Sequence, residues 1–195
     1  FRVAPIRRGE MVAGYMLSAI IIGIIMSIIT FIAGEAYIYA SGGELMPVMD
    51  ILKVLALIVL SVFTSTSIVY LLVSFVKTTN AYSTMCTIIG TMIGFLVGVY
   101  IPIGILPAGV QTVIKLVPVS HAAVIFRQIF MEKPMAELFF HADPASVTNF
   151  KEEFGVVFNV GDTTLSVWAM IGYLAAAGVV FFVVSVLRMM KKSAK

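Results

Sequence analysis

The sequence predicts an all-α fold, a polytopic transmembrane helical bundle with a re-entrant helical hairpin on its outer side. Four long segments carry no charged residue: 11–34, 54–76, 81–105 and 165–187. Each is long enough to span, because about 20 helical residues cross a bilayer core of roughly 30 Å. The composition agrees, since 61% of residues are hydrophobic and 12% are charged, against about a quarter charged in soluble domains.

Charged residues are divided unequally between the two sides that four crossings define. The side with both chain ends and the turn 77–80 has a single acid, Glu10, and eight bases: Arg2, Arg7, Arg8, Lys77, Arg188, Lys191, Lys192 and Lys195. The other side, residues 35–53 and 106–164, has nine acids and five bases. Basic residues next to spans are retained in the cytoplasm. Both termini are therefore predicted to be cytoplasmic in a multi-pass protein of the cell membrane, and the net charge of +3 is attributed to topology, not to nucleic-acid binding.

Residues 1–10, FRVAPIRRGE, lead into the first span without a linker. Pro5 disfavours helix at the preceding residue and suits the first turn of a new helix. A short amphipathic cytoplasmic segment is therefore expected before residue 11. Arg7 and Arg8 are suited to anionic lipid headgroups, and each such contact is worth about 1 kcal/mol.

The second span carries hydroxyl groups on one helical face, at Ser61, Thr64 and Ser65. Hydroxyls within a bilayer bond to backbone carbonyls or across helices, at roughly 1 kcal/mol each. The alternative is that they form a mildly polar wall of a translocation path. No charged residue interrupts any span, which argues against a proton relay or an ion-coupled carrier, because both need ionisable groups at depth.

The third span has glycine at every fourth position, Gly90, Gly94 and Gly98. Such a face lets helices approach closely in lipid, so it is predicted to pack against a neighbouring span or, alternatively, against a second subunit. Cys86 lies in the same span and is the only cysteine of the sequence, so no intrachain disulfide is expected. No repeat or long linker divides residues 1–195, which are expected to form a single transmembrane domain.

Prolines divide the apolar stretch after residue 101 into two predicted half-length helices. Pro107 fits a first helical position, and Pro118 ends that helix. Ser120 is suited to cap a second helix, which ends before Pro134. Each piece is roughly 16 to 18 Å long, half a bilayer. They form either a re-entrant hairpin, shielded by protein or lining a cavity, or two amphipathic helices lying flat on the outer interface.

Three polar, potentially cationic side chains belong to this hairpin: Lys115, His121 and Arg127. We expect them to extend towards headgroups or water while their apolar parts remain in the membrane. The two histidines, His121 and His141, have no matching ligands near them in the sequence. No metal site is therefore predicted.

Residues 132–164 form the one clearly aqueous segment, interpreted as a solvated extracellular loop. Asp143 followed by Pro144 predicts a helix start, and Gly155 predicts the end of that helix. Asp162 is expected to cap the last span.

Three sequence elements follow one another along the chain: F-x-x-x-P-I-x-R and then G-Y within residues 1–15, PIGILP at 102–107, and LVPVSHAAVIFRQIFM at 116–131. Their order resembles that of type-2 ABC transporter permeases, the membrane subunits of ATP-binding-cassette exporters. In that family the first element is a coupling helix that docks on a separate ATPase subunit. The resemblance assigns this role to Phe1, Pro5, Ile6, Arg7, Arg8 and Glu10.

The resemblance also places Pro107, Pro118, His121 and Arg127 in a re-entrant hairpin before the last span. Family members have six spans, so two more are expected before Phe1. The resemblance implies a permease subunit that exports a drug, peptide, lipid or glycan and works as a pair of identical or different permease chains. ATP and Mg²⁺ would bind to the partner ATPase, and this chain would bind no cofactor.

The sequence lacks the usual catalytic motifs, so we expect a chain that is not itself an enzyme. The sequence contains no G-x-x-x-x-G-K-[ST] phosphate loop, no H-E-x-x-H pair and no G-x-S-x-G elbow, which are the usual nucleotide, zinc and nucleophile signatures. Two alternatives stay open. One is a non-transporting scaffold or sensor subunit, and the other is a membrane-embedded lipid-modifying enzyme, for which His121 and Arg127 have no companion acid within the membrane.

Overall fold

The computed structural model describes residues 8–160 and 163–192. These residues form seven α-helices, one 3₁₀ helix and one two-stranded β-hairpin, which confirms the predicted all-α class. Contacts divide the chain into two compact units, residues 1–76 with 175–195, and residues 77–174. The last helix, α7 (Val167–Lys192), begins in the second unit and ends in the first.

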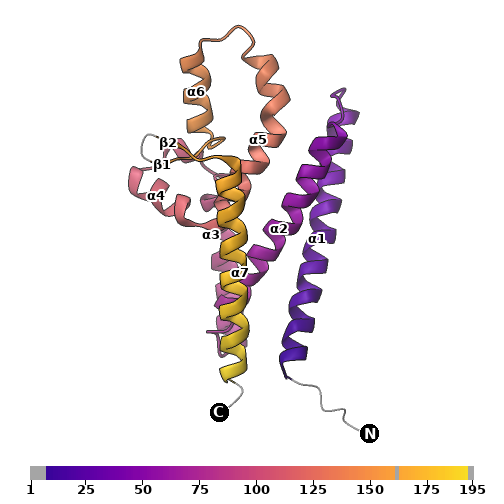
Figure 1. The fold of residues 1–195 in the computed structure, drawn as a ribbon, viewed down its shortest axis with the longest axis vertical. Coiled ribbons are helices and arrows are strands. Elements are labelled where there is room, and N and C mark those ends of the chain that lie inside the picture. The colour runs from indigo at the N-terminus through magenta and orange to yellow at the C-terminus, as the bar shows by residue number, and fades with distance from the viewer. Residues whose placement is uncertain (1–7, 161–162, 193–195) are drawn as a thin grey trace. The chain divides into compact units, whose positions relative to one another are not determined.

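The first unit contains α1 (Arg8–Ala40), α2 (Val48–Val73) and the C-terminal part of α7. Helices α1 and α2 are antiparallel and lie side by side (Figure 1). Partway along them, a Cβ built on Gly23 would lie 2.8 Å from a methyl carbon of Val62, so the helices approach closely there. At their connection, the Glu35 carboxylate accepts a hydrogen bond from the Met46 amide at 3.0 Å.

Local sequence signals explain the turn between α1 and α2. Gly42 has a φ of 87°, and the Gly43 amide donates to the Ile38 carbonyl at 2.9 Å. This arrangement is typical of a helix that ends in glycine. Pro47 directly precedes the first residue of α2, where its missing amide costs nothing because amides at a helix start have no partner within the helix.

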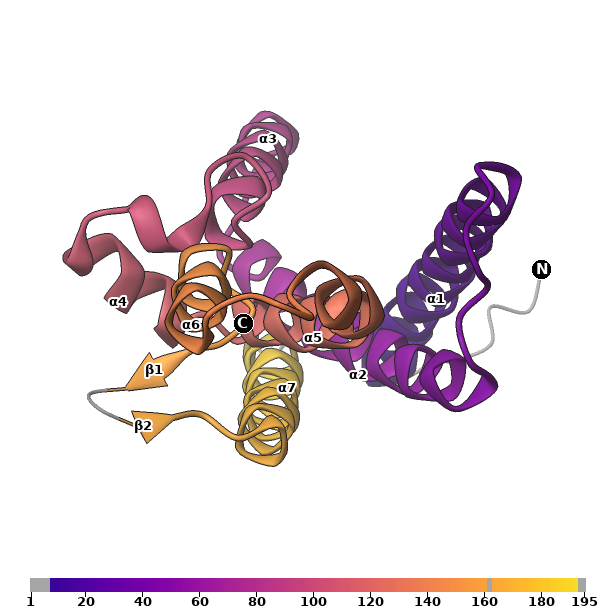
Figure 2. The ribbon, with the colours of Figure 1, turned by 90° about the horizontal axis from the view of Figure 1, so that it is seen from above.

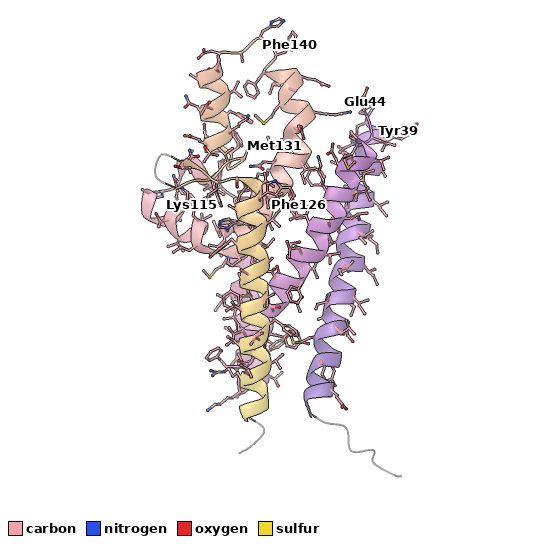
Figure 3. All side chains as sticks on the ribbon, viewed as in Figure 1. Tyr39, Glu44, Lys115, Phe126, Met131 and Phe140 are labelled. Atoms are coloured by element: carbon pink, nitrogen blue, oxygen red, sulfur yellow. The ribbon has the colours of Figure 1, made fainter. Side chains whose placement is uncertain are left out.

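The second unit contains α3 (Thr79–Leu96), η1 (Ile103–Ile105), α4 (Ala108–Leu116), α5 (Pro118–Leu138), α6 (Pro144–Glu153), β1 (Asn159–Val160), β2 (Thr163–Thr164) and the start of α7. The strands are antiparallel, with Asn159 opposite Thr164. Seen from above, α4 and the two strands lie on the side of α6 that faces away from α5 (Figure 2). Helices α5 and α6 meet at a connection that carries Phe140 (Figure 3).

The core of the second unit is built around the N-terminal half of α5. Residues 120–125 are all buried. A helix that is buried on every side is apolar all round, and this half of α5 is mostly so, whereas the half from Arg127 onwards carries charges. The largest fully buried side chains elsewhere in the unit are Ile114, Phe158, Met170 and Leu174.

Within the described residues, three helical stretches are long and apolar enough to cross a membrane, Ala13–Ala40, Val48–Val73 and Val167–Arg188, and the bent pair α4 and α5 would make a fourth if it is one broken span. The three stretches correspond to the first, second and fourth predicted spans. The third prediction, 81–105, has the wrong end, because α3 stops at Leu96 and the chain turns at Gly98, which has a φ of 71°. That α3 crosses the membrane remains a prediction.

Candidate functional site

The predicted coupling segment lies only partly within the described residues. Phe1, Pro5, Ile6 and Arg7 are outside them, whereas α1 begins at Arg8 and Glu10 is exposed in its first turn. From Arg8 the helix continues unbroken for 33 residues, about 50 Å at 1.5 Å per residue. The end of the coupling segment and the first predicted span therefore form one continuous helix.

A cation–π contact joins the last turns of α7 to the end of α2 in the first unit. The guanidinium carbon of Arg188 lies 3.5 Å from the centre of the Phe75 ring. At this distance the cation is attracted by the negative face of the ring. Arg188, one of the bases that predicted the topology, therefore also links two helices.

The hydroxyl face of α2 packs against α7. The Ser61 hydroxyl donates to the Ile58 carbonyl at 3.1 Å, and the Thr64 hydroxyl donates to the Leu60 carbonyl at 3.0 Å. Thr64 is fully buried, and a Cβ built on Gly178 of α7 would lie 2.6 Å from its hydroxyl oxygen. Ser65 is half-buried. The arrangement favours the packing interpretation of these residues over an open polar wall.

The three glycines of the third predicted span do not form one helical face. Gly90 has no neighbouring atom within 4 Å of a built Cβ, and Gly94 lies against the ring of Tyr100. Gly98 follows the end of α3 and has positive φ. The predicted packing face is therefore wrong at Gly98, because a period of four in the sequence does not show where the helix stops.

The predicted hairpin corresponds to α4 and α5, which meet at an angle of 93° that suits either a broken span or a re-entrant loop, and we call this bend the elbow. Helix α4 begins at Ala108, so Pro107 is the residue before the helix and not its first residue, as was predicted. Pro118 is the first residue of α5. Ser120 does not cap a helix, and its hydroxyl donates to the Leu96 carbonyl of α3 at 2.9 Å. Helix α5 also continues through Pro134 to Leu138, so its predicted end before Pro134 is wrong, and the next residue, Met135, is buried.

His121 is enclosed within the second unit. It is buried, with its Nδ1 atom 3.2 Å from the Val117 carbonyl oxygen. Its ring contacts those of Phe158 and Tyr173, at centroid distances of 5.4 and 4.7 Å. The expectation that His121 extends towards headgroups or water is wrong, because two aromatic rings enclose it.

Lys115 at the end of α4 is also turned inwards. Its ammonium group donates to the backbone carbonyl of Asn159 at 2.7 Å, which links α4 to strand β1. The side chain is half-buried, and its extension towards headgroups or water remains a prediction.

Arg127 joins the C-terminal ends of two helices. Its Nη2 atom donates to the carbonyls of Val97 and Gly98 after α3, and its Nη1 atom lies 3.5 Å from the carbonyl oxygen of Gly155 after α6. The ends of helices carry partial negative charge and unpaired carbonyls. The guanidinium therefore binds carbonyls at both helix ends at once, while the expected extension of Arg127 towards headgroups or water remains a prediction.

Both glycines beside Arg127 are required by their geometry. Gly98 and Gly155 have φ values of 71° and 62°, which L side chains rarely adopt. A Cβ on Gly98 would also lie 3.1 Å from Nη2, and a Cβ on Gly155 would lie 3.3 Å from Nη1. We call Arg127 with Gly98 and Gly155 the arginine clasp.

Several polar residues that form hydrogen bonds in the second unit were not identified from the sequence. Gln128, next to Arg127, donates to the Val156 carbonyl at 2.8 Å, and the Tyr173 hydroxyl donates to the Leu116 carbonyl at 2.6 Å.

The start of α7 is capped by Ser166, whose hydroxyl accepts a hydrogen bond from the Ala169 amide. Asp162, the cap predicted from the sequence, lies outside the described residues. A serine just before an apolar helix is itself a capping signal and was available in the sequence.

Among residues 8–160 and 163–192, no three His, Cys, Asp or Glu side chains come together in a group that could hold a metal ion.

A family model described as "ABC-2 family transporter protein" matches residues 1–187. Searches of curated proteins and of solved structures found no match.

Proposed function

This chain belongs to the ABC-2 transporter family, and we propose that it is the permease subunit of an exporter driven by a separate ATPase. Membership in the family makes it a membrane component of an ABC transporter. We further propose that transport is export and not import. The functional unit in this proposal has two permease chains and two ATPase subunits.

The continuity of α1 carries the proposal. A displacement of the first turn of a helix is transmitted along the whole helix, whereas a flexible linker would not transmit that displacement. Helix α1 in turn packs on α2 at Gly23 and Val62. Helix α2 packs on α7 where Thr64 meets Gly178. A displacement of residues 8–10 would therefore reach all three helices of the first unit.

In the proposed cycle, ATP and Mg²⁺ bind to the ATPase pair on the cytoplasmic side. Closure of that pair displaces residues 1–10, and α1 passes the displacement into the membrane. Both termini of the chain are cytoplasmic in this scheme, in keeping with the eight bases and one acid of that side. The cargo is a drug, peptide, lipid or glycan.

Co-purification tests the proposal. The tagged chain is expressed with a candidate ATP-binding-cassette ATPase from the same organism, purified in mild detergent, and reconstituted into proteoliposomes. We expect the ATPase to be retained and its ATP hydrolysis to depend on the permease, with an ATPase that lacks its phosphate-loop lysine as the inactive control. Recovery of the chain without an ATPase, at normal expression of both, would favour a scaffold or sensor subunit.

A further inference from the structure

The connection between α1 and α2 exposes large apolar side chains. We call residues 35–53 the α1–α2 tip, and Figure 3 labels Tyr39 and Glu44 in it. The large side chains of the tip that are more than half exposed are those of Tyr37, Tyr39, Leu45, Val48, Met49 and Leu52. An exposed apolar surface of this kind marks contact with a membrane or with another protein.

The polar groups of the tip are mostly engaged within it. The Glu35 carboxylate accepts the Met46 amide at 3.0 Å, and Asp50 forms an ion pair with Lys53 at 2.7 Å. Glu44, in the loop between the two helices, is exposed. Apart from this acid, the surface that the tip presents is chiefly aliphatic and phenolic.

Two tyrosines of the tip project from opposite sides of α1. Each residue of an α-helix is turned about 100° from the one before, so Tyr37 and Tyr39 point about 200° apart. Both are exposed, Tyr37 by 74% and Tyr39 by 67%. A docked protein covers one side of a helix, whereas a lipid layer surrounds it. The two tyrosines therefore favour lipid as the partner.

The spacing of tyrosines along α1 matches the thickness of a bilayer. Tyr15, near the other end of the helix, is 65% exposed and lies 22 residues before Tyr37, about 33 Å along the axis. The hydrocarbon core is roughly 30 Å thick, and tyrosine is enriched at both of its boundaries. With Tyr15 at one boundary, the tip lies in the headgroup layer beyond the other.

We propose that the α1–α2 tip binds the lipid headgroup layer and anchors that end of α1. A phenol ring suits this layer because its body is apolar and its hydroxyl finds polar partners. The proposal rests on the proposed function in one respect, that an ATPase displaces the other end of α1. With the tip anchored, such a displacement tilts α1 about the tip and does not move the helix through the membrane.

Fluorescence quenching in proteoliposomes tests the place of the tip in the full chain. Trp168 is the single tryptophan, so Trp168→Phe gives a background in which Tyr39→Trp reports on the tip. Three quenchers are compared: a nitroxide on the phosphatidylcholine headgroup, bromine near the methyl end of the acyl chain, and aqueous iodide on both sides of the membrane. We expect the headgroup nitroxide to quench Tyr39→Trp most strongly.

Each other result at this position would overturn the proposal. Strongest quenching by iodide would place the tip in water, and strongest quenching by bromine would place it in hydrocarbon. Protection from all three quenchers would show that protein covers the tip. Should Tyr39→Trp fail to fold, Tyr37→Trp provides the same readout.

Two matched tryptophans, placed singly in the same background, calibrate the quenchers. Val179 is exposed near the middle of α7, so Val179→Trp should be quenched best by bromine. Ser146 is exposed on α6, so Ser146→Trp should be quenched best by iodide. If neither lipid quenches Val179→Trp, the predicted span of α7 and with it the proposed function fail, and the strongest quencher of Tyr39→Trp still decides the place of the tip.

Addition of ATP and Mg²⁺ to proteoliposomes that also contain a candidate ATP-binding-cassette ATPase tests the anchoring. Headgroup quenching of Tyr39→Trp should stay the same, while that of Tyr15→Trp, placed singly in the same background, should change. Equal changes at both positions would overturn the anchor. If neither changes, the displacement of α1 and the tilt both fail, whereas the binding of the tip to headgroups is decided by the three quenchers alone.

Discussion

The Nη2 atom of Arg127 donates to the carbonyl of Gly98 at 2.9 Å, and Gly98 is the residue whose positive φ ends α3. The same guanidinium also reaches Gly155, which has positive φ after α6. Two helix ends therefore share one cation. Among the described residues, no carboxylate forms an ion pair with Arg127, so helix-end carbonyls are the partners that stabilise its charge.

Replacing Arg127 by methionine is expected to destabilise the second unit. Hydrogen bonds to charged groups contribute about 1.5 to 3 kcal/mol, and Met keeps much of the apolar stem while it leaves the carbonyls of both helix ends unpaired. Arg127→Lys should lie between the wild type and Arg127→Met, because an ammonium group cannot reach both ends in the same way. Melting temperature in detergent is the measurement.

Lys133→Met is the matched control for the clasp, since it removes an exposed cation from the same helix, where a surface contact contributes only about 0 to 1 kcal/mol. We expect its melting temperature to remain near that of the wild type. If Arg127→Met and Lys133→Met have the same melting temperature, the clasp contributes nothing to stability.

Gly104 provides a second test of the packing around the clasp. A Cβ built on Gly104 would lie 2.4 Å from the Cα of Glu153 and 3.0 Å from the carbonyl oxygen of Glu152. Backbone atoms cannot move aside as a flexible side chain can, so Gly104→Ala should destabilise the protein by about 1 to 3 kcal/mol. Gly109→Ala, which meets no atom within 4 Å, should be harmless in the same unfolding assay. Equal stability of the two variants would contradict the contact between η1 and α6.

The contact between α2 and α7 predicts that Gly178→Ala lowers the melting temperature. Its Cβ would meet the buried Thr64 hydroxyl at 2.6 Å and ring carbons of Phe63 at 3.1 Å. Gly172→Ala on the same helix has open space around it and serves as control. Thr64→Val, of similar volume, should leave transport unchanged if Thr64 belongs to a packing contact. A change in cargo selectivity in Thr64→Val would restore the hydroxyl face as part of the translocation path.

Local signals predicted some elements and missed others for a physical reason. Helix α6 begins at Pro144, and Gly155 follows its end with positive φ, as the pattern of residue types predicts, because turn and cap chemistry acts over a few residues. The end of α3 depends instead on Gly98, whose carbonyl is bound by Arg127 from 29 residues further along the chain. No period in the sequence of α3 reveals that contact.

The same distinction applies to the polar residues of the elbow. Their types suggested exposure at a membrane surface, yet Lys115, His121 and Arg127 all bind or approach backbone carbonyls within the second unit. Sequence identifies such side chains as unusual in an apolar stretch. Which carbonyls Lys115 and Arg127 bind depends on the tertiary arrangement of the second unit, because their partners lie 44 and 29 residues away in the sequence.

The predicted orientation, with both termini in the cytoplasm, determines which introduced cysteines a membrane-impermeant thiol reagent should label in intact cells. In a Cys86→Ala background, a cysteine at Ser146 on α6 should be labelled and one at Ser193 should be protected. The reason is the excess of bases on the side that holds both termini, since basic residues are retained in the cytoplasm. Labelling at Ser193 with protection at Ser146 would invert the topology.

The central claim is that residues 1–10 pass movement from an ATPase into α1, and reversal of Arg7 and Arg8 to glutamate tests it most directly. Lys191→Glu with Lys192→Glu is the matched control, because it reverses two bases on the same predicted side at the other end of the chain. At equal membrane expression, the Arg7 and Arg8 variant should lose ATPase retention in a pull-down and cargo efflux from cells, while the control keeps both. Normal ATPase retention and full efflux by the Arg7 and Arg8 variant would contradict the coupling role and leave these arginines as lipid anchors.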